Sequence, residues 1–183
     1  MPLPVLQTPR LELRPLDAGA LSAMAQGDAA ALAERTGAVF EPPVEPPPLF
    51  GDEIPFYVTR LQADPADAVW ISWLISVQST RVAVGVGGLG GGPGREGRFT
   101  IGYSVYPAHR GRGYATEAME RLLAWAFAQP RASVARATIP PWNTPSIRVA
   151  EKLGMTPAGN TEDREVGEVL VYELEAPDGG PQR

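Results

Sequence analysis

The stretch of residues 99–129 constrains the fold of this chain more than any other. A strand-like run over 99–106 leads to the turn Arg-Gly-Arg-Gly at 110–113, and a strongly helical pattern follows over 114–129. A strand that enters a glycine-rich turn and then a helix builds an anion site. The free N–H groups of the first helical turn point one way, and the helix dipole favours negative charge there. We therefore expect this turn to hold the pyrophosphate of a coenzyme.

Glycine at 111 and 113 lets the backbone adopt positive φ and approach phosphate oxygens closely. The neighbouring arginines are able to add charge-assisted contacts, or to serve only as exposed loop charges. A dinucleotide fingerprint is disfavoured, because the third glycine position is a threonine and prolines, not an acidic residue, follow the next strand. The P-loop pattern is absent. The predicted coenzyme contacts of this segment are Arg110, Gly111, Arg112, Gly113, Tyr114, Ala115 and Thr116.

The length of 183 residues suits one domain, with an expected core at 8–175 and a frayed tail at 176–183. A net charge of -5 argues against a nucleic-acid surface. The chain has no cysteine and one histidine, so we expect neither a metal site nor a cysteine nucleophile. No apolar run reaches the roughly 20 residues of a membrane span, and no signal peptide pattern is present. We expect a cytoplasmic protein without a membrane partner.

Elsewhere in the chain, the apolar residues follow either the two-residue period of a strand or the 3.6-residue period of a helix. Predicted strands cover 11–14, 69–77, 81–89, 99–105, 133–139, 156–159 and 166–174, and predicted helices cover 18–35, 52–63, 114–129 and 145–153. Asp17 is suited to cap the first helix, which Gly27-Asp28 is able to interrupt. The proline-rich residues 41–48 indicate a stiff connector. The predicted fold is α/β: a mixed, mostly antiparallel sheet of six to seven strands flanked by helices.

Two motifs, in the right order and context, carry a family resemblance. Arg110-x-x-Gly113-x-Ala115 is similar to the coenzyme A signature of the GCN5-related N-acetyltransferases. Asn143-x-x-Ser146 and the Glu-Lys-Leu-Gly-Met run at 151–155 look like the second motif of that superfamily. Ile-Gly-Tyr at 101–103 and the residues at 113–118 resemble the branch that acetylates the N-termini of ribosomal proteins. The resemblance spans roughly residues 11–174.

The resemblance implies a sheet splayed at the coenzyme site, where acetyl-CoA lies like an extra strand against the backbone of Ser104 and Val105. It implies direct acetyl transfer to a primary amine, either a protein N-terminus or a small molecule. Asn143 and Ser146 match positions near the coenzyme and the reacting sulfur, and Ser146 is the candidate proton donor to the thiolate. Tyr103 and Trp142 are the candidate acceptor contacts.

Two positions depart from the family pattern. Many relatives carry a tyrosine acid where this chain has Ala150, and a glutamate base where it has Thr100. An α-amine with a pKa near 8 is able to lose its proton to solvent, so no base is assigned. These departures motivate a second reading, a catalytically weak acyl-CoA-binding module. The expected partner is the amine acceptor, and the expected assembly is a monomer or homodimer.

Overall fold

The computed structural model describes residues 3–41, 44, 51–164 and 166–177, and in them it forms two sheets. The first is antiparallel throughout, and its order is β1 (Leu6–Gln7), β2 (Leu11–Pro15), β3 (Ser72–Val77), β4 (Ala83–Gly88) and β6 (Gly102–Val105). The second has the order β5 (Arg98–Thr100), β7 (Val134–Ile139), β9 (Gly167–Glu175) and β8 (Thr156–Asp163). Only the β5–β7 pair is parallel among these strands.

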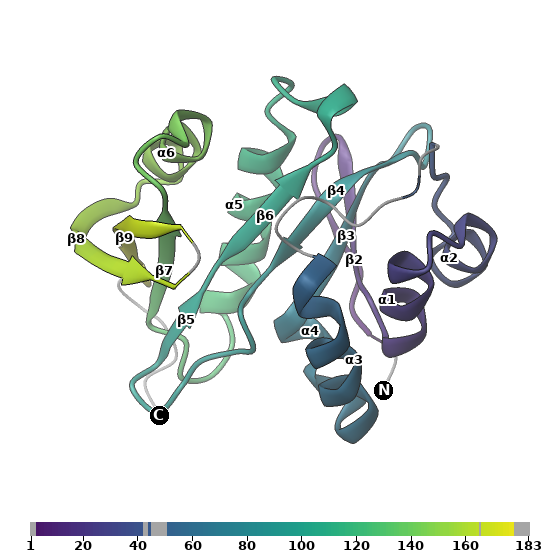
Figure 1. The fold of residues 1–183 in the computed structure, drawn as a ribbon, viewed down its shortest axis with the longest axis horizontal. Helices are drawn as coiled ribbons and strands as arrows, with labels where there is room; N and C mark the ends of the chain where they lie inside the picture. Colours follow the sequence, from purple (N-terminus) through teal and green to yellow (C-terminus); the bar gives the residue numbers. More distant parts are fainter. Residues whose placement is uncertain (1–2, 42–43, 45–50, 165, 178–183) are drawn as a thin grey trace.

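Helices cover both faces of the first sheet (Figure 1). On one face lie α1 (Ala18–Ala25), α3 (Ile54–Ala63) and α4 (Ala68–Ile71), with α2 (Ala29–Thr36) beside α1; on the other lies α5 (Tyr114–Phe127). Strand alternation explains the apolar run of β3: Trp73 and Ile75 pack into the core that includes α5, and Leu74 packs into the core that includes α1 and α3. The last helix, α6 (Thr144–Lys152), follows β7.

Residues 98–105 pass from one sheet to the other and so create the splayed centre. β5 pairs with β7, and the bond from the Ile101 N–H to the Arg136 carbonyl, 2.8 Å long, is the last between the two segments. From Gly102 onward the chain pairs with β4 instead. The facing edges of β6 and β7 are therefore unpaired with each other, and the strands diverge in Figure 1. This confirms the predicted mixed, splayed α/β fold.

Several element predictions needed correction. The predicted strand 69–77 begins as helix, because a 3₁₀ turn at Pro65–Asp67, capped by Asp64, continues into α4. The predicted helix 18–35 is divided into α1 and α2, each with an aspartate cap, Asp17 and Asp28. The described residues form nine strands rather than six or seven, since β1 was not predicted and 99–105 is divided into β5 and β6.

The connector predicted at 41–48 falls outside the described residues except for Glu41 and Val44, and so does the tail from 178 onward. No helix among the described residues is both long enough and apolar enough to cross a membrane.

Candidate active site

A cavity of about 370 Å³ opens where the two sheets diverge. Its walls come from β4, β6, β7, α6 and the start of α3. Four predicted site residues line it, although they come from two distant segments: Tyr103, Ser104, Asn143 and Ser146. The fold thus brings the end of the central strand and the second motif to one hollow.

The beginning of α6 holds its site residues through a helix cap. The Asn143 side-chain oxygen accepts a hydrogen bond from the Ser146 N–H at 3.3 Å, so Asn143 is the N-cap of α6. The Tyr103 hydroxyl donates to the Ser146 carbonyl at 3.2 Å and so joins β6 to α6. Burial raises the pKa of Tyr103, and a side-chain hydrogen bond with Ser146 opposes part of this rise. The Ser146 side chain lines the cavity beside this contact.

The turn before α5 has the backbone conformation that its glycines predict. Gly111 has φ of 75° and Gly113, the N-cap of α5, has φ of 79°. Both values lie in the left-handed region, which costs a residue with a Cβ about 1–2 kcal/mol. No side chain caps this helix, and no described carbonyl accepts from the N–H groups of residues 114–116. These free donors suit an anion such as a pyrophosphate.

The two arginines of the turn brace the loop itself. Arg110 Nε donates to the Val105 carbonyl at 3.0 Å, and Arg112 Nη2 donates to the Ala108 carbonyl at 3.3 Å. Both side chains are exposed. A carbonyl oxygen has two lone pairs, so Val105 keeps the capacity to accept from a ligand. The predicted coenzyme contacts of these residues remain predictions.

Arg10, Thr8 and Glu117 form a clamp that holds this turn against the beginning of the chain, and the sequence did not reveal it. Arg10 Nε and Nη2 both lie 2.6 Å from Glu117 Oε2, and Arg10 Nη1 donates to the Arg112 carbonyl at 3.0 Å. The Thr8 hydroxyl donates to the other oxygen of Glu117. Arg121 lies four residues after Glu117, a spacing that permits an ion pair on a helix, but the carboxylate pairs with Arg10 instead. Burial raises the pKa of Glu117, but the bonds from Thr8 and Arg10 outweigh burial and leave the pKa below its ordinary value.

A second pair that the sequence did not reveal lies where the beginning of α3 lines the cavity. Glu53 and Tyr57 line it, and the Tyr57 hydroxyl donates to Glu53 Oε2 at 2.6 Å. Burial, followed by this hydrogen bond, raises the pKa of Tyr57, which keeps the phenol protonated. The helical segment 52–63 was recognised by its apolar residues, and only the tertiary fold reveals that its first turn faces the cavity.

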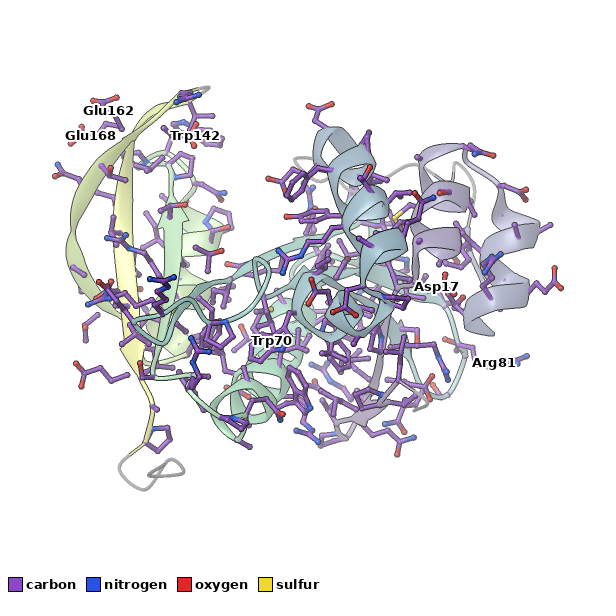
Figure 2. The ribbon with its side chains drawn as sticks, turned by 90° about the horizontal axis from the view of Figure 1, so that it is seen from below. Asp17, Trp70, Arg81, Trp142, Glu162 and Glu168 are labelled. Carbon is purple, nitrogen blue, oxygen red and sulfur yellow. The ribbon has the colours of Figure 1, made fainter. Side chains whose placement is uncertain are left out.

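Of the other positions considered in the sequence, Thr100 and Ala150 lie at the cavity and Trp142 does not. Thr100 and Ala150 line the cavity, and neither side chain is able to take up a proton at neutral pH. Trp142 does not line it: the side chain is 69% exposed, and Figure 2 shows it on the side of the molecule formed by the second sheet. Its contact with the acceptor remains a prediction. Among the described residues no group of three or more His, Cys, Asp or Glu side chains is placed to hold a metal ion.

Comparison with known proteins defines the class to which this fold and site belong. Residues 10–156 match the family described as the acetyltransferase (GNAT) domain. The chain is 30% identical over 151 residues to the uncharacterized N-acetyltransferase YjdG of Bacillus subtilis, covering 82% of this chain and 88% of that one. The chain therefore belongs to the GNAT family and is an acetyltransferase.

Solved structures show the same fold. The ribosomal-protein-S5-alanine acetyltransferase of Vibrio fischeri aligns with a TM-score of 0.70 at 14% identity, covering 97% of this chain and 100% of that one. The RimL ribosomal L7/L12 alpha-N-protein acetyltransferase, in complex with coenzyme A, aligns with a TM-score of 0.68 at 17% identity, covering 94% and 98%. At these identities the likenesses show the fold, and the resemblance to the ribosomal-protein branch remains a prediction from the sequence.

Proposed function

We propose that this protein transfers the acetyl group of acetyl-CoA directly to a primary amine, either a protein N-terminus or a small molecule. The observation that carries the proposal is the continuity of two sites along β6. This strand lines the cavity that Ser146 also lines, and its end leads through the turn at 110–113 to the open N-terminus of α5. In this proposal, the anion site and the reaction cavity lie along one strand edge that no other described strand pairs with.

The residues of this chain fit coenzyme A. The free N–H groups of residues 114–116 and the left-handed glycines support binding of the pyrophosphate. A Cβ added at Gly111 would meet no atom within 4 Å, so open space for a ligand lies beside it. On the unpaired edge of β6, the backbone groups of Tyr103 and Val105 are open to the amides of the pantetheine arm. The predicted contact through the Ser104 backbone needs correction, because the bond from the Tyr106 N–H to the Val84 carbonyl sets an alternation in which Ser104 pairs with Val86 of β4.

Direct acetyl transfer requires few catalytic groups from the protein. Acetyl-CoA supplies a thioester, and a neutral amine attacks its carbonyl so that a C–N bond forms and the C–S bond breaks. Neither Thr100 nor Ala150 is able to accept a proton, so we assign the proton of the attacking amine to solvent. We assign the Ser146 hydroxyl as the proton donor to the departing thiolate, and the hydroxyl then regains a proton from solvent. A chain without cysteine is compatible with direct transfer, which needs no thiol nucleophile.

The test is release of free thiol from acetyl-CoA in the presence of amines and N-terminal peptides, together with calorimetry of acetyl-CoA binding. We expect binding and turnover with at least one acceptor. Binding without turnover across the panel would favour the rival activity, an acyl-CoA-binding module, which Thr100 and Ala150 motivate. Absence of binding would contradict both.

A further inference from the structure

Glu53 is the one charged side chain among the described residues that line the cavity. The polar groups on the other walls are neutral, such as those of Thr100, Asn143 and Ser146. In a largely neutral hollow, a single carboxylate determines the sign of the charge that is attracted. The cavity therefore favours a ligand group that is positively charged.

The position of Glu53 is fixed by its neighbours in α3. Ile54 and Leu61 of this helix are 1% and 2% exposed, so the helix is anchored in the core that includes α1. Glu53 is the N-cap residue, yet its side chain makes no capping hydrogen bond. A carboxylate at this position ordinarily accepts from the free N–H groups of the first turn. Here it accepts instead from the Tyr57 hydroxyl at the cavity wall.

The carboxylate keeps capacity for a ligand. Tyr57 engages Oε2, and no described residue donates to Oε1. The nearby cation, Arg60, is held elsewhere: its Nε lies 2.6 Å from Asp67 Oδ2, and its Nη2 donates to the Gly91 carbonyl at 2.8 Å. The charge of Glu53 is therefore oriented by a neutral donor and is not paired with a cation of the described chain.

We propose that Glu53, oriented by Tyr57, binds a positively charged group of the acceptor other than the amine that reacts. The inference rests on the proposed acetyl transfer and names the substrate class: amines that carry a second cation. The reacting amine must be neutral when it attacks, and a carboxylate bound to it would favour its protonated form. A second cation meets no such conflict. A diamine and a peptide with a basic side chain share this chemistry.

The experiment compares acceptors that differ only by the second charge. The first pair is 1,4-diaminobutane and 1-aminopentane, and the second is the dipeptide amides Ala-Lys and Ala-norleucine. We expect wild type to prefer the charged member of at least one pair by about tenfold in kcat/KM, the size of a charged hydrogen bond. Glu53→Gln should reduce this preference to near unity and leave acetyl-CoA binding unchanged. The pair that responds identifies the acceptor as a small amine or a peptide.

Asp52→Asn is the matched control, because it removes the same charge from the adjacent exposed position, which does not line the cavity. It should retain the wild-type preference. Retention of the preference in Glu53→Gln, or equal loss in both variants, would overturn the inference while leaving the acetyltransferase intact. Turnover of neither pair with normal acetyl-CoA binding would overturn it as well. Failure of the wild type to bind acetyl-CoA would instead refute the proposed function.

Discussion

The turn before α5 and the cavity between the sheets are built in opposite ways. The turn at 110–113 and the first helical residues, 114–116, are consecutive in the chain; the glycines of the turn have positive φ, and the start of the helix presents N–H groups. The cavity collects side chains from α3, β6 and α6, which are far apart in the sequence. We infer that the two sites have separate roles. The turn and the start of α5 bind the pyrophosphate of the coenzyme through backbone groups, and the side chains of the cavity determine the chemistry and the choice of acceptor. Mutations should therefore separate coenzyme affinity from turnover.

Gly113→Glu should give the largest effect, on the backbone site alone. It places a side chain with a negative charge at a left-handed position beside the free N–H groups. We expect the Kd for acetyl-CoA, measured by calorimetry, to rise by at least about 100-fold. The new carboxylate repels the phosphates and opposes several charge-assisted contacts, and a loss of about 1.4 kcal/mol in binding free energy raises the Kd tenfold. Gly37→Glu is the matched control, because Gly37 has φ of 71° at the end of α2. Equal loss of binding in both variants would contradict the assignment.

Ser146→Ala should affect the cavity and spare the turn. Removing a proton donor to the leaving thiolate should lower kcat by roughly tenfold to a hundredfold, while the Kd for acetyl-CoA stays within about twofold. Thr144→Val removes a hydroxyl from the same helical turn at an exposed position outside the cavity, and it should change neither quantity. An unchanged kcat in Ser146→Ala would remove this residue from the mechanism.

Glu117→Gln should weaken the clamp that holds the turn. Loss of a charged hydrogen bond to Arg10 should lower the free energy of unfolding by about 1–2 kcal/mol at pH 7 and raise the Kd for acetyl-CoA a few-fold. Because the pKa of folded Glu117 lies below its ordinary value of 4.5, its contribution is present above pH 4.5. It is lost as the pH falls through the folded pKa.

Denaturant unfolding at several pH values checks this prediction: the gap between wild type and Glu117→Gln should close below pH 4.5. Glu120→Gln, an exposed change on the same helix, is the control and should leave stability within about 0.5 kcal/mol at every pH. A gap that persists undiminished at low pH would show that the ionised carboxylate is not its source.

Tyr103→Phe should give the smallest effect, since one neutral hydrogen bond to the Ser146 carbonyl is lost. We expect the free energy of unfolding to fall by about 1 kcal/mol and kcat to decrease two- to threefold. Because burial raises the pKa of Tyr103 above 10, wild type should show no loss of rate from its ionisation up to pH 10. Tyr106→Phe is the control: its buried hydroxyl lacks a partner among the described residues, so its removal should be neutral or stabilising. Equal kinetics in the two variants would refute a role for the Tyr103 bond.

Local chemistry made some features predictable from the sequence. Gly111 and Gly113 predicted the turn, the period of 114–129 predicted α5, and Asp17 predicted a cap, because each depends on residues only a few positions apart. The strand expected at 69–77 was partly wrong, since periodicity does not distinguish a buried helical turn from a strand in a short apolar run. The site residues Tyr103, Ser104, Asn143 and Ser146 came from the family resemblance, and the fold places them on one cavity.

The sequence by itself therefore determined the glycine turn at 110–113, the helix that follows it and the fold class. It did not reveal the partner of Glu117, because Arg10 lies 107 positions away and nothing local distinguishes it from Arg121. Nor did it reveal the position of Glu53. Both depend on how separate elements pack, and only the tertiary structure decides which charges meet. Backbone conformation is a local property of a few residues, whereas the charge of a cavity is a sum over distant ones.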